Sequence, residues 1–519
     1  MIAFLDVLLR GLALCAQAVA VGGLVFLLVA LRGETGEVGG RARRRSTRLV
    51  AAAAMALAAV QAMLLALHLA ALADEHGWPW AEALTTGYFA AGAARALGAV
   101  LLAVAARRLA APAPGGAAAP AVALGVGLVA SAAWLSHASA RLTDQATLLA
   151  LDALHQAAAA AWVGGLAHLV WTAAAGAGPW PVAVLRRFSA TTLGAVALLV
   201  ATGTGLAWFY VGEAASLVGT AYGLMVQTKL VMLLLLLGLG GLNFLTVRRL
   251  AAGDASPLRR VRWFVEVEVG LGLTVLFVAA SLTSLPPAVD VVADRASPGE
   301  VARALAPAWP RLVSPAHAEL PADDPEAPRT AADRAWSEYN HNVAGLFVLL
   351  MGALATLHAV WGVGWARHWP LVFLGLGAFM LVRSDPGSWP LGPIGFWEGW
   401  TYASVVQHRL FVVLVVAFGL FEWAVRTGRA PRPGWAYAFP LLAVVGGGLL
   451  LTHSHALENL KSEFLAEVTH APLGVLALAV GWGRWLELRL GPPADALPRR
   501  IWAGALCLVG LMLLTYHES

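Results

Sequence analysis

Residues 220–247 read TAYGLMVQTKLVMLLLLLGLGGLNFLTV, an apolar run whose one charged side chain is Lys229. About 20 apolar residues suffice for a helix to cross the hydrocarbon core of a bilayer. The run is rich in leucine and shows no two-residue alternation, so it predicts a helix and not a barrel strand. This stretch therefore predicts a transmembrane helix.

Similar runs fill most of the 519-residue chain, which is 59% hydrophobic and 13% charged. A soluble globular protein carries about 25% charged residues. Eight spans are predicted first, at residues 4–31, 48–73, 85–106, 119–138, 147–174, 189–210, 220–247 and 263–285. Six follow a Pro-rich stretch, at residues 341–363, 369–383, 403–425, 436–456, 467–488 and 500–517. We predict an all-α, polytopic transmembrane helical bundle of about 14 spans.

Arginine clusters predict how the spans are oriented, because basic loops are retained in the cytoplasm. Every second loop is basic, beginning with the cluster at 41–48 and continuing with Arg107–Arg108 and Arg186–Arg187. Both termini are then expected in the periplasm. The predicted domains are an eight-helix membrane domain at 1–285, a periplasmic linker at 286–340 and a six-helix, His-rich membrane domain at 341–519.

The rare residues exclude several functions. The lysines are Lys229 and Lys461, and neither lies in a Gly-Lys-Ser/Thr phosphate loop, so this chain contains no P-loop motor. Cys15 and Cys507 lie far apart and form no CxxC motif. The net charge of +5 arises in the basic loops, so we expect the lipid bilayer and not nucleic acid as a partner. No enzymatic activity is predicted.

Histidine carries the strongest functional signal. Of 14 histidines, only His168, His358 and His368 are predicted near the cytoplasm. The others are predicted at or near the outer face: His68, His76, His137, His155, His317, His341, His408, His453, His455, His470 and His517. Histidines that merely pack in a core have no reason to prefer one side of the membrane.

Five of the outer histidines are the predicted metal ligands, because they fall at one depth on separate helices: His341, His408, His453, His455 and His470. Imidazole suits copper, zinc, iron and nickel, and this chain has no Met cluster to favour a soft thioether site. A copper ion, Cu(I) or Cu(II), is the predicted ligand. Structural hydrogen-bonding histidines are the alternative.

The spacing of these residues sets conditions on the site. His453 and His455 point about 200° apart on a helix, so both reach one site only if the helix ends or unwinds there. Glu467 and His470, three residues apart at a helix start, are expected to share a face. Glu467 is therefore a candidate polar residue of the pathway.

A second group of polar residues lies in the first half. His68, His137, Asp152 and His155 are a possible second metal or pathway site, with a hydrogen-bonded polar cluster as the alternative. Lys229 is a candidate pathway residue, since ionisable side chains inside the membrane are costly. Asp6 and Arg10, four apart, are expected to pair. The glycines of Trp162-Val-Gly-Gly165 are expected to let helix backbones approach.

Several short motifs fall in a characteristic order: Arg187-Phe-Ser189, Thr202-Gly203, Trp208, Tyr222-Gly223, Lys229 and Asn243, with Trp162-Val-Gly-Gly165 before them. In these the chain resembles the copper resistance protein D (CopD) family of bacterial inner-membrane proteins. The second half, with Gln407-His408-Arg409 and Thr452-His-Ser-His455, resembles the extension of its longer members.

This resemblance implies copper homeostasis or resistance, with copper moved across the inner membrane and exchanged with a periplasmic copper-carrier protein. Two alternatives stay open. A haem b protein that transfers electrons across the bilayer would need histidine pairs facing each other, which His341 and His358 on one span offer only superficially. A copper receptor or cuproenzyme assembly partner would bind copper without transporting it.

Overall fold

The computed structural model describes residues 2–34, 36–110, 116, 118–173, 180–252, 258–316, 319–320, 330–452 and 461–518. In these residues regular structure is helical, apart from one isolated β-bridge between Ser388 and Ile394. Thirteen of the described helical segments are long and apolar enough to cross a membrane, and Ala118–Trp134 is a shorter apolar helix. The all-α, multi-span prediction is confirmed, and each of the fourteen expected segments has most of its length on one of these described helices.

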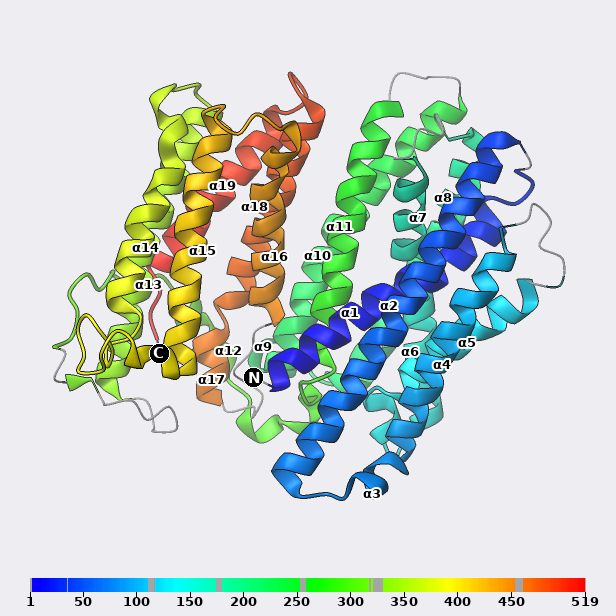
Figure 1. Cartoon of the computed structure of the whole chain (residues 1–519), viewed down its shortest axis with the longest axis horizontal. Coiled ribbons are helices and arrows are strands. Elements are labelled where there is room, and N and C mark those ends of the chain that lie inside the picture. The colour runs from blue at the N-terminus through cyan, green and yellow to red at the C-terminus, as the bar shows by residue number, and fades with distance from the viewer. Residues whose placement is uncertain are drawn as a thin grey trace. The chain divides into compact units, whose positions relative to one another are not determined.

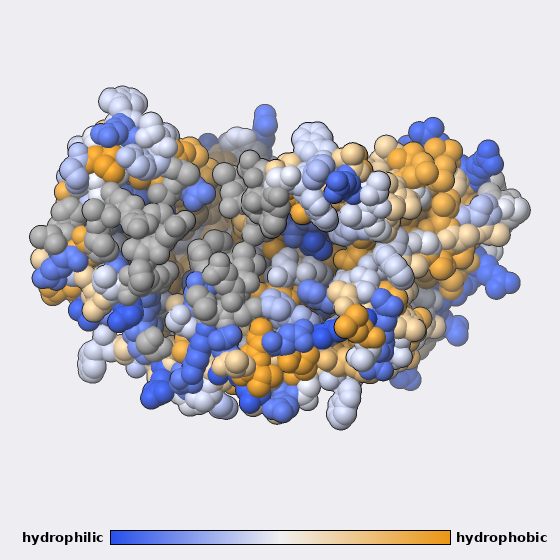
Figure 2. All heavy atoms as spheres, turned by 90° about the horizontal axis from the view of Figure 1, so that it is seen from below, coloured by the Kyte–Doolittle hydropathy of each residue, from blue (hydrophilic) through white to orange (hydrophobic). Residues whose placement is uncertain are grey.

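The described chain divides into two compact units. Unit 1 comprises the described residues of Met1–Arg295, and unit 2 those of Ala296–Leu451 and Leu460–Ser519. The functional domains assigned above, with their boundaries at 285 and 340, stay a prediction. Seen from the lower end of Figure 1, hydrophilic residues lie interspersed with apolar patches on the visible face (Figure 2).

Unit 1 is drawn in blue to green in Figure 1. Its longer helices and the turns that join them are α1 (Ile2–Val25), η1 (Phe26–Ala30), α2 (Glu37–His76), α3 (Trp80–Leu84), α4 (Gly87–Arg108), α5 (Ala118–Trp134), η3 (His137–Ala140), α6 (Gln145–Ala159), η4 (Ala160–Gly164), α7 (Gly165–Ala173), α8 (Val182–Tyr210), α9 (Ala214–Gly219), α10 (Ala221–Ala251) and α11 (Leu258–Leu282).

Glycine brings α1 against the π-helical turn η4. A Cβ atom on Gly164 would lie 1.8 Å from the carbonyl oxygen of Ala18, and one on Gly22 would lie 2.2 Å from that of Ala160. The two backbones therefore touch, as expected for Trp162-Val-Gly-Gly165. Because α6, η4 and α7 form one continuous helical segment, this contact also positions the polar residues of α6 relative to α1.

Unit 2 runs from green to red in Figure 1. Its main elements are α12 (Pro298–Leu305), α13 (Ala331–Ala359), η8 (Trp365–Leu371), α14 (Val372–Arg383), η9 (Glu398–Thr401), α15 (Ala403–Arg426), η10 (Pro433–Tyr437), α16 (Ala438–Thr452), α17 (Lys461–Glu467), α18 (His470–Leu490) and α19 (Ala496–Leu514).

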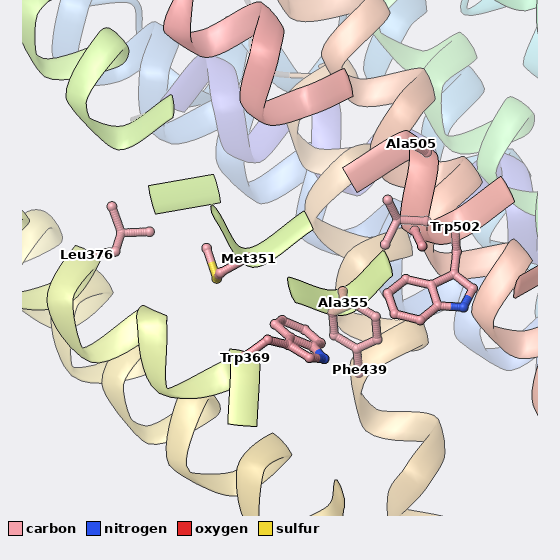
Figure 3. Packing of buried hydrophobic residues seen from close by; sticks show 9 residues of the cluster. Met351, Ala355, Trp369, Leu376, Phe439, Trp502 and Ala505 are labelled. Atoms are coloured by element: carbon pink, nitrogen blue, oxygen red, sulfur yellow. The ribbon is translucent and has the colours of Figure 1, made fainter. Parts of the chain in front are cut away.

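The core of unit 2 is aromatic. Trp369, Phe439 and Trp502 are buried together with Met351, as Figure 3 shows. The Arg426 guanidinium lies over these rings, with its Cζ atom 4.8 Å from the centre of Trp369. Cation–π contact and burial thus hold α15 against η8 and α19.

Several boundaries differ from those expected, and two of them concern predicted site residues. Helix α13 begins at Ala331, ten residues before the predicted span, because Thr330 and Asp333 form a capping box. Between α17 and α18, residues 468–469 form a turn. Glu467 therefore ends one helix and His470 opens the next, so the two do not share the face of a single continuous helix.

Candidate functional site

Asp6 is the centre of a hydrogen-bonded chain in unit 1. Its carboxylate lies 2.7 Å from Arg10 Nε, which confirms the predicted pair, and 2.8 Å from His68 Nε2. The Tyr88 hydroxyl lies 2.5 Å from His68 Nδ1. With its N–H on Nε2, His68 donates to Asp6 and accepts from Tyr88. Both ring nitrogens are engaged, so His68 would have to release a partner before binding a metal.

Asp152 lies on α6, about two turns from its start. Its carboxylate lies near the side chains of Ser136 and Gln156, and the positive charge of Lys229 acts on it. The Gln156 side-chain oxygen also accepts a hydrogen bond from Gln17 Nε2 of α1 at 2.9 Å. The structure therefore surrounds this intramembrane carboxylate with donors and a cation.

His155 follows one turn later on α6 and faces α8. Its Nδ1 lies 3.1 Å from Thr202 Oγ1, whose own proton is donated to the Leu198 carbonyl at 2.7 Å. Thr202 must therefore accept from His155, which places the N–H on Nδ1 and the lone pair on Nε2. Gly203 leaves room for the ring, since a Cβ there would lie 3.1 Å from His155 Cε1.

His137 lies just outside the membrane-spanning segments, in η3. Its Nε2 is 3.2 Å from the Leu282 carbonyl, and its ring centre is 6.5 Å from that of Tyr210. Burial holds the pKa of His137 below its ordinary value, and Arg10 and Arg141 act in the same direction. The imidazole is consequently neutral near pH 7, which is the form that binds metals.

We call His137, Asp152, His155, Thr202 and Lys229 the Asp152 cluster. These residues come from η3, α6, α8 and α10. The cluster thus contains three of the four residues predicted as a second site: His137, Asp152 and His155. The charge of Lys229 acts on Asp152 and on His155. His68 belongs to the neighbouring Asp6 chain instead.

The five predicted ligands of the second half are only partly described. His453 and His455 lie outside the described residues. His341 Nδ1 lies 2.8 Å from the Ser337 carbonyl, and its ring centre is 4.4 Å from that of Tyr516. His408 is half-exposed, with Nδ1 2.7 Å from Asp385 Oδ1.

The bond of His408 leaves its Nε2 as the ligand nitrogen, and a carboxylate behind the ring, as here, is typical of metal-binding histidine. His470 opens α18. Across the part of the chain that the structure describes, no group of three or more His, Cys, Asp and Glu side chains could hold a metal ion. The five-histidine site therefore stays a prediction that depends on His453 and His455.

His168 and His368, predicted near the cytoplasm, have structural partners. His168 is fully buried, with Nδ1 2.7 Å from Ser46 Oγ and Nε2 2.9 Å from the Val19 carbonyl. His368 accepts a hydrogen bond from Trp423 Nε1 at 2.8 Å. These contacts are those of satisfied hydrogen-bonding histidines.

One buried group is absent from the sequence prediction. Glu268 of α11 accepts hydrogen bonds from Trp162 Nε1 at 2.9 Å and from Asn243 Nδ2 at 2.7 Å. Trp162 and Asn243 occur in the motifs quoted above, but they lie 106 and 25 positions from Glu268 along the chain. Only the tertiary packing of η4, α10 and α11 brings them together. We call these three residues the Glu268 triad.

Comparison with known proteins shows that part of the chain is similar to proteins named for copper resistance and copper transport. Residues 182–282, which include Thr202, Lys229, Asn243 and Glu268, match the family model for copper resistance protein D. The copper transport protein CutJ of Bacillus subtilis (strain 168) is 31% identical over 160 residues, which cover 30% of this chain and 28% of CutJ. No solved structure matches the chain. This multi-pass membrane protein therefore carries a copper resistance protein D family domain over residues 182–282.

Proposed function

We propose that this protein binds copper ions at the periplasmic side of the bacterial inner membrane and moves them into or across that membrane. One observation carries the proposal: the family-matched segment supplies Thr202 and Lys229 to the Asp152 cluster. Ionisable groups inside a membrane are rare and mark pathways or binding sites. The matched segment thus contributes two residues, Thr202 and Lys229, to the ionisable cluster.

Five histidines of the second half are the proposed capture ligands: His341, His408, His453, His455 and His470. We propose that a periplasmic copper-carrier protein delivers copper to them. The contact of His408 Nδ1 with Asp385 supports this role, because it orients Nε2 for a metal. Glu467, beside His470 in sequence, is proposed to attract the cation.

The Asp152 cluster is a second proposed site, within unit 1. The proposed contacts for a passing copper ion are the free Nε2 of His155 and the Asp152 carboxylate, since imidazole suits copper. Lys229 disfavours a resting cation beside Asp152, so binding there is proposed to be weak. Weak binding is what a transport pathway requires, since an ion that enters must also leave.

Elemental analysis of purified protein tests the capture site. We expect His453→Ala/His455→Ala to lower the bound copper, because two of five proposed ligands are lost. His368→Ala is the matched control, since this histidine bonds to Trp423, and its copper content should equal that of the wild type. Unchanged copper in the double variant would overturn the ligand assignment.

Transport is tested separately in proteoliposomes. We expect the wild-type protein to accumulate copper inside vesicles, and Asp152→Asn to reduce the rate. Binding without accumulation would identify a copper receptor or assembly partner instead. A Soret band in the purified protein, with no copper present, would identify a haem b protein.

A further inference from the structure

Glu268 is a carboxylate buried near the middle of α11, ten residues from Leu258 and fourteen from Leu282. It is 2% exposed. Trp162 and Asn243 each donate to one of its oxygens, at 2.9 and 2.7 Å. On α10, Gly240 leaves space for the carboxylate, because a Cβ there would lie 3.3 Å from Glu268 Oε1.

Within the described residues, no charged group is among the interactions that act on Glu268; burial and its two neutral donors are the contributors. The elements packed against α11 are α1, α7, η4 and α10. Their titratable or charged side chains are Asp6, Arg10 and Cys15 on α1, His168 on α7, and Tyr222, Lys229, Arg248 and Arg249 on α10.

A buried carboxylate without a counter-charge is expensive in its ionised form. The desolvation of a single buried ion costs several kcal/mol, and two neutral hydrogen bonds offset only part of this. The ionised Glu268 carboxylate therefore needs a positively charged partner to lower this cost. That partner is either a metal cation or a proton.

The donor set around Glu268 favours the proton. The Trp162 indole nitrogen only donates and cannot coordinate a metal. In the described chain Glu268 belongs to no group of three or more His, Cys, Asp and Glu side chains that could hold a metal ion. A proton needs one oxygen lone pair and an acceptor, and the Asn243 amide supplies the acceptor if it turns its oxygen toward the acid.

The Glu268 triad is built on the helices that also carry the Asp152 cluster. Asp152 and Trp162 lie ten residues apart on the continuous α6–η4 segment, or about 15 Å along its axis. Lys229 and Asn243 lie fourteen apart on α10, or about 21 Å. A change in charge at the Asp152 cluster thus acts on helices that also carry the Glu268 triad, and the reverse holds as well.

We propose that Glu268 binds and releases a proton in the interior of unit 1, and that this proton exchange is coupled to ion movement through the Asp152 cluster. On binding, one carboxylate oxygen takes a proton and Glu268 becomes a neutral acid whose O–H is donated to Asn243. On release, the proton leaves and both oxygens accept hydrogen bonds again. The coupling, though not the protonation, rests on the proposed copper transport.

Infrared difference spectroscopy of the full-length protein between acidic and alkaline pH tests the protonation directly. We expect a carbonyl band of a protonated carboxylic acid that is lost in Glu268→Gln and retained in Glu266→Gln, the matched change two residues away. In Trp162→Phe the band should move to higher wavenumber, because a hydrogen bond to the carbonyl oxygen is removed. Identical bands in the wild type, E268Q and W162F would overturn the proposal.

Copper flux under an imposed pH gradient tests the coupling. We expect the gradient to change the wild-type rate several-fold, and E268Q to keep its bound copper but lose this response. An equal response in E268Q would overturn the coupling. If the wild-type protein binds no copper at all, the proposed function fails, while the infrared result still decides whether Glu268 carries a proton.

Discussion

The negative charge of Asp152 favours the charged form of Lys229. Asp152→Asn removes that charge and leaves the ammonium group without it. We expect a loss in the free energy of unfolding of about 1–2 kcal/mol, because the two charges attract each other inside unit 1 without forming a contact ion pair. Thermal unfolding in detergent measures it. Asp144→Asn, the same chemical change at the exposed start of α6, should leave the melting temperature unaltered.

A double variant separates stability from transport. In Asp152→Asn/Lys229→Met neither charge remains, so most of the lost stability should return. Copper accumulation in vesicles should not return, because the carboxylate is still missing. Recovery of both properties would mean that the Asp152 cluster serves structure alone.

Glu300 provides a pH-dependent contact in unit 2. Its carboxylate lies 2.7 Å from Lys461 Nζ and caps α12 through Ser297. The hydrogen bond from Lys461 lowers the pKa of Glu300 from 4.5 to about 2, and its bonds to Ser297 add to this. The stabilisation is therefore complete above pH 4.5 and is lost as the pH falls toward 2.

Glu300→Gln tests this contact. Between those two pH values, the wild-type melting temperature should fall more steeply than that of the variant, because only the wild type binds an additional proton on unfolding. Lys461→Met should flatten the curve in the same way. Parallel curves for all three proteins would show that the ion pair contributes nothing.

Local spacing explains which polar contacts the sequence predicts. Asp6 and Arg10 lie one helical turn apart, so their pairing follows from helix geometry. The third partner of Asp6, His68, is 62 residues away, and only the packing of α2 against α1 brings it near. The contacts of the Glu268 triad cannot be predicted from local spacing for the same reason, because its members lie on three separate elements.

At the level of helices, hydropathy identifies spans better than their ends. An apolar run reports the part of a helix that lies in lipid, whereas hydrogen bonds in water determine where the helix begins. The capping box at Thr330 therefore starts α13 ten residues before the apolar run. The turn at residues 468–469 is missed for a related reason, since apolar periodicity does not register a two-residue break.

The contact of α1 with η4 gives a prediction for one glycine. In Gly164→Ala the new Cβ would meet backbone atoms of Ala18, which cannot turn aside as a side chain can. We expect a loss of about 1–3 kcal/mol in the free energy of unfolding, the usual range for overpacking. Gly194→Ala on α8 is the control, because no atom lies within 4 Å of its Cβ.

Thermal unfolding measures both glycine variants. G164A should also slow copper accumulation, since a shift of η4 moves Trp162 away from Glu268 and Asp152 away from Lys229. Gly194 is exposed, so G194A should match the wild type in both assays. A G164A protein as stable as G194A would mean that α1 and η4 separate at no cost.

At the scale of the whole chain, its few charged residues are distributed unevenly. The arginine clusters alternate from loop to loop, and the predicted capture histidines lie at the opposite ends of the spans. This pattern predicts one orientation for both halves, with the termini, Leu142 and Trp397 outside the cell membrane and Arg108 and Trp365 inside. The capture histidines face the periplasm only if that orientation is correct.

Cysteine labelling tests the orientation at four exposed positions. In a background without Cys15 and Cys507, we expect Leu142→Cys and Trp397→Cys to react in intact cells with a maleimide that cannot cross the inner membrane. Arg108→Cys and Trp365→Cys should react only after permeabilisation, because basic loops stay in the cytoplasm. Each half contributes one position to each class, so the two halves are tested independently. If Trp397→Cys and Trp365→Cys exchange their behaviour, the second half is inverted, and His408 would then release copper on the inner side instead of capturing it outside.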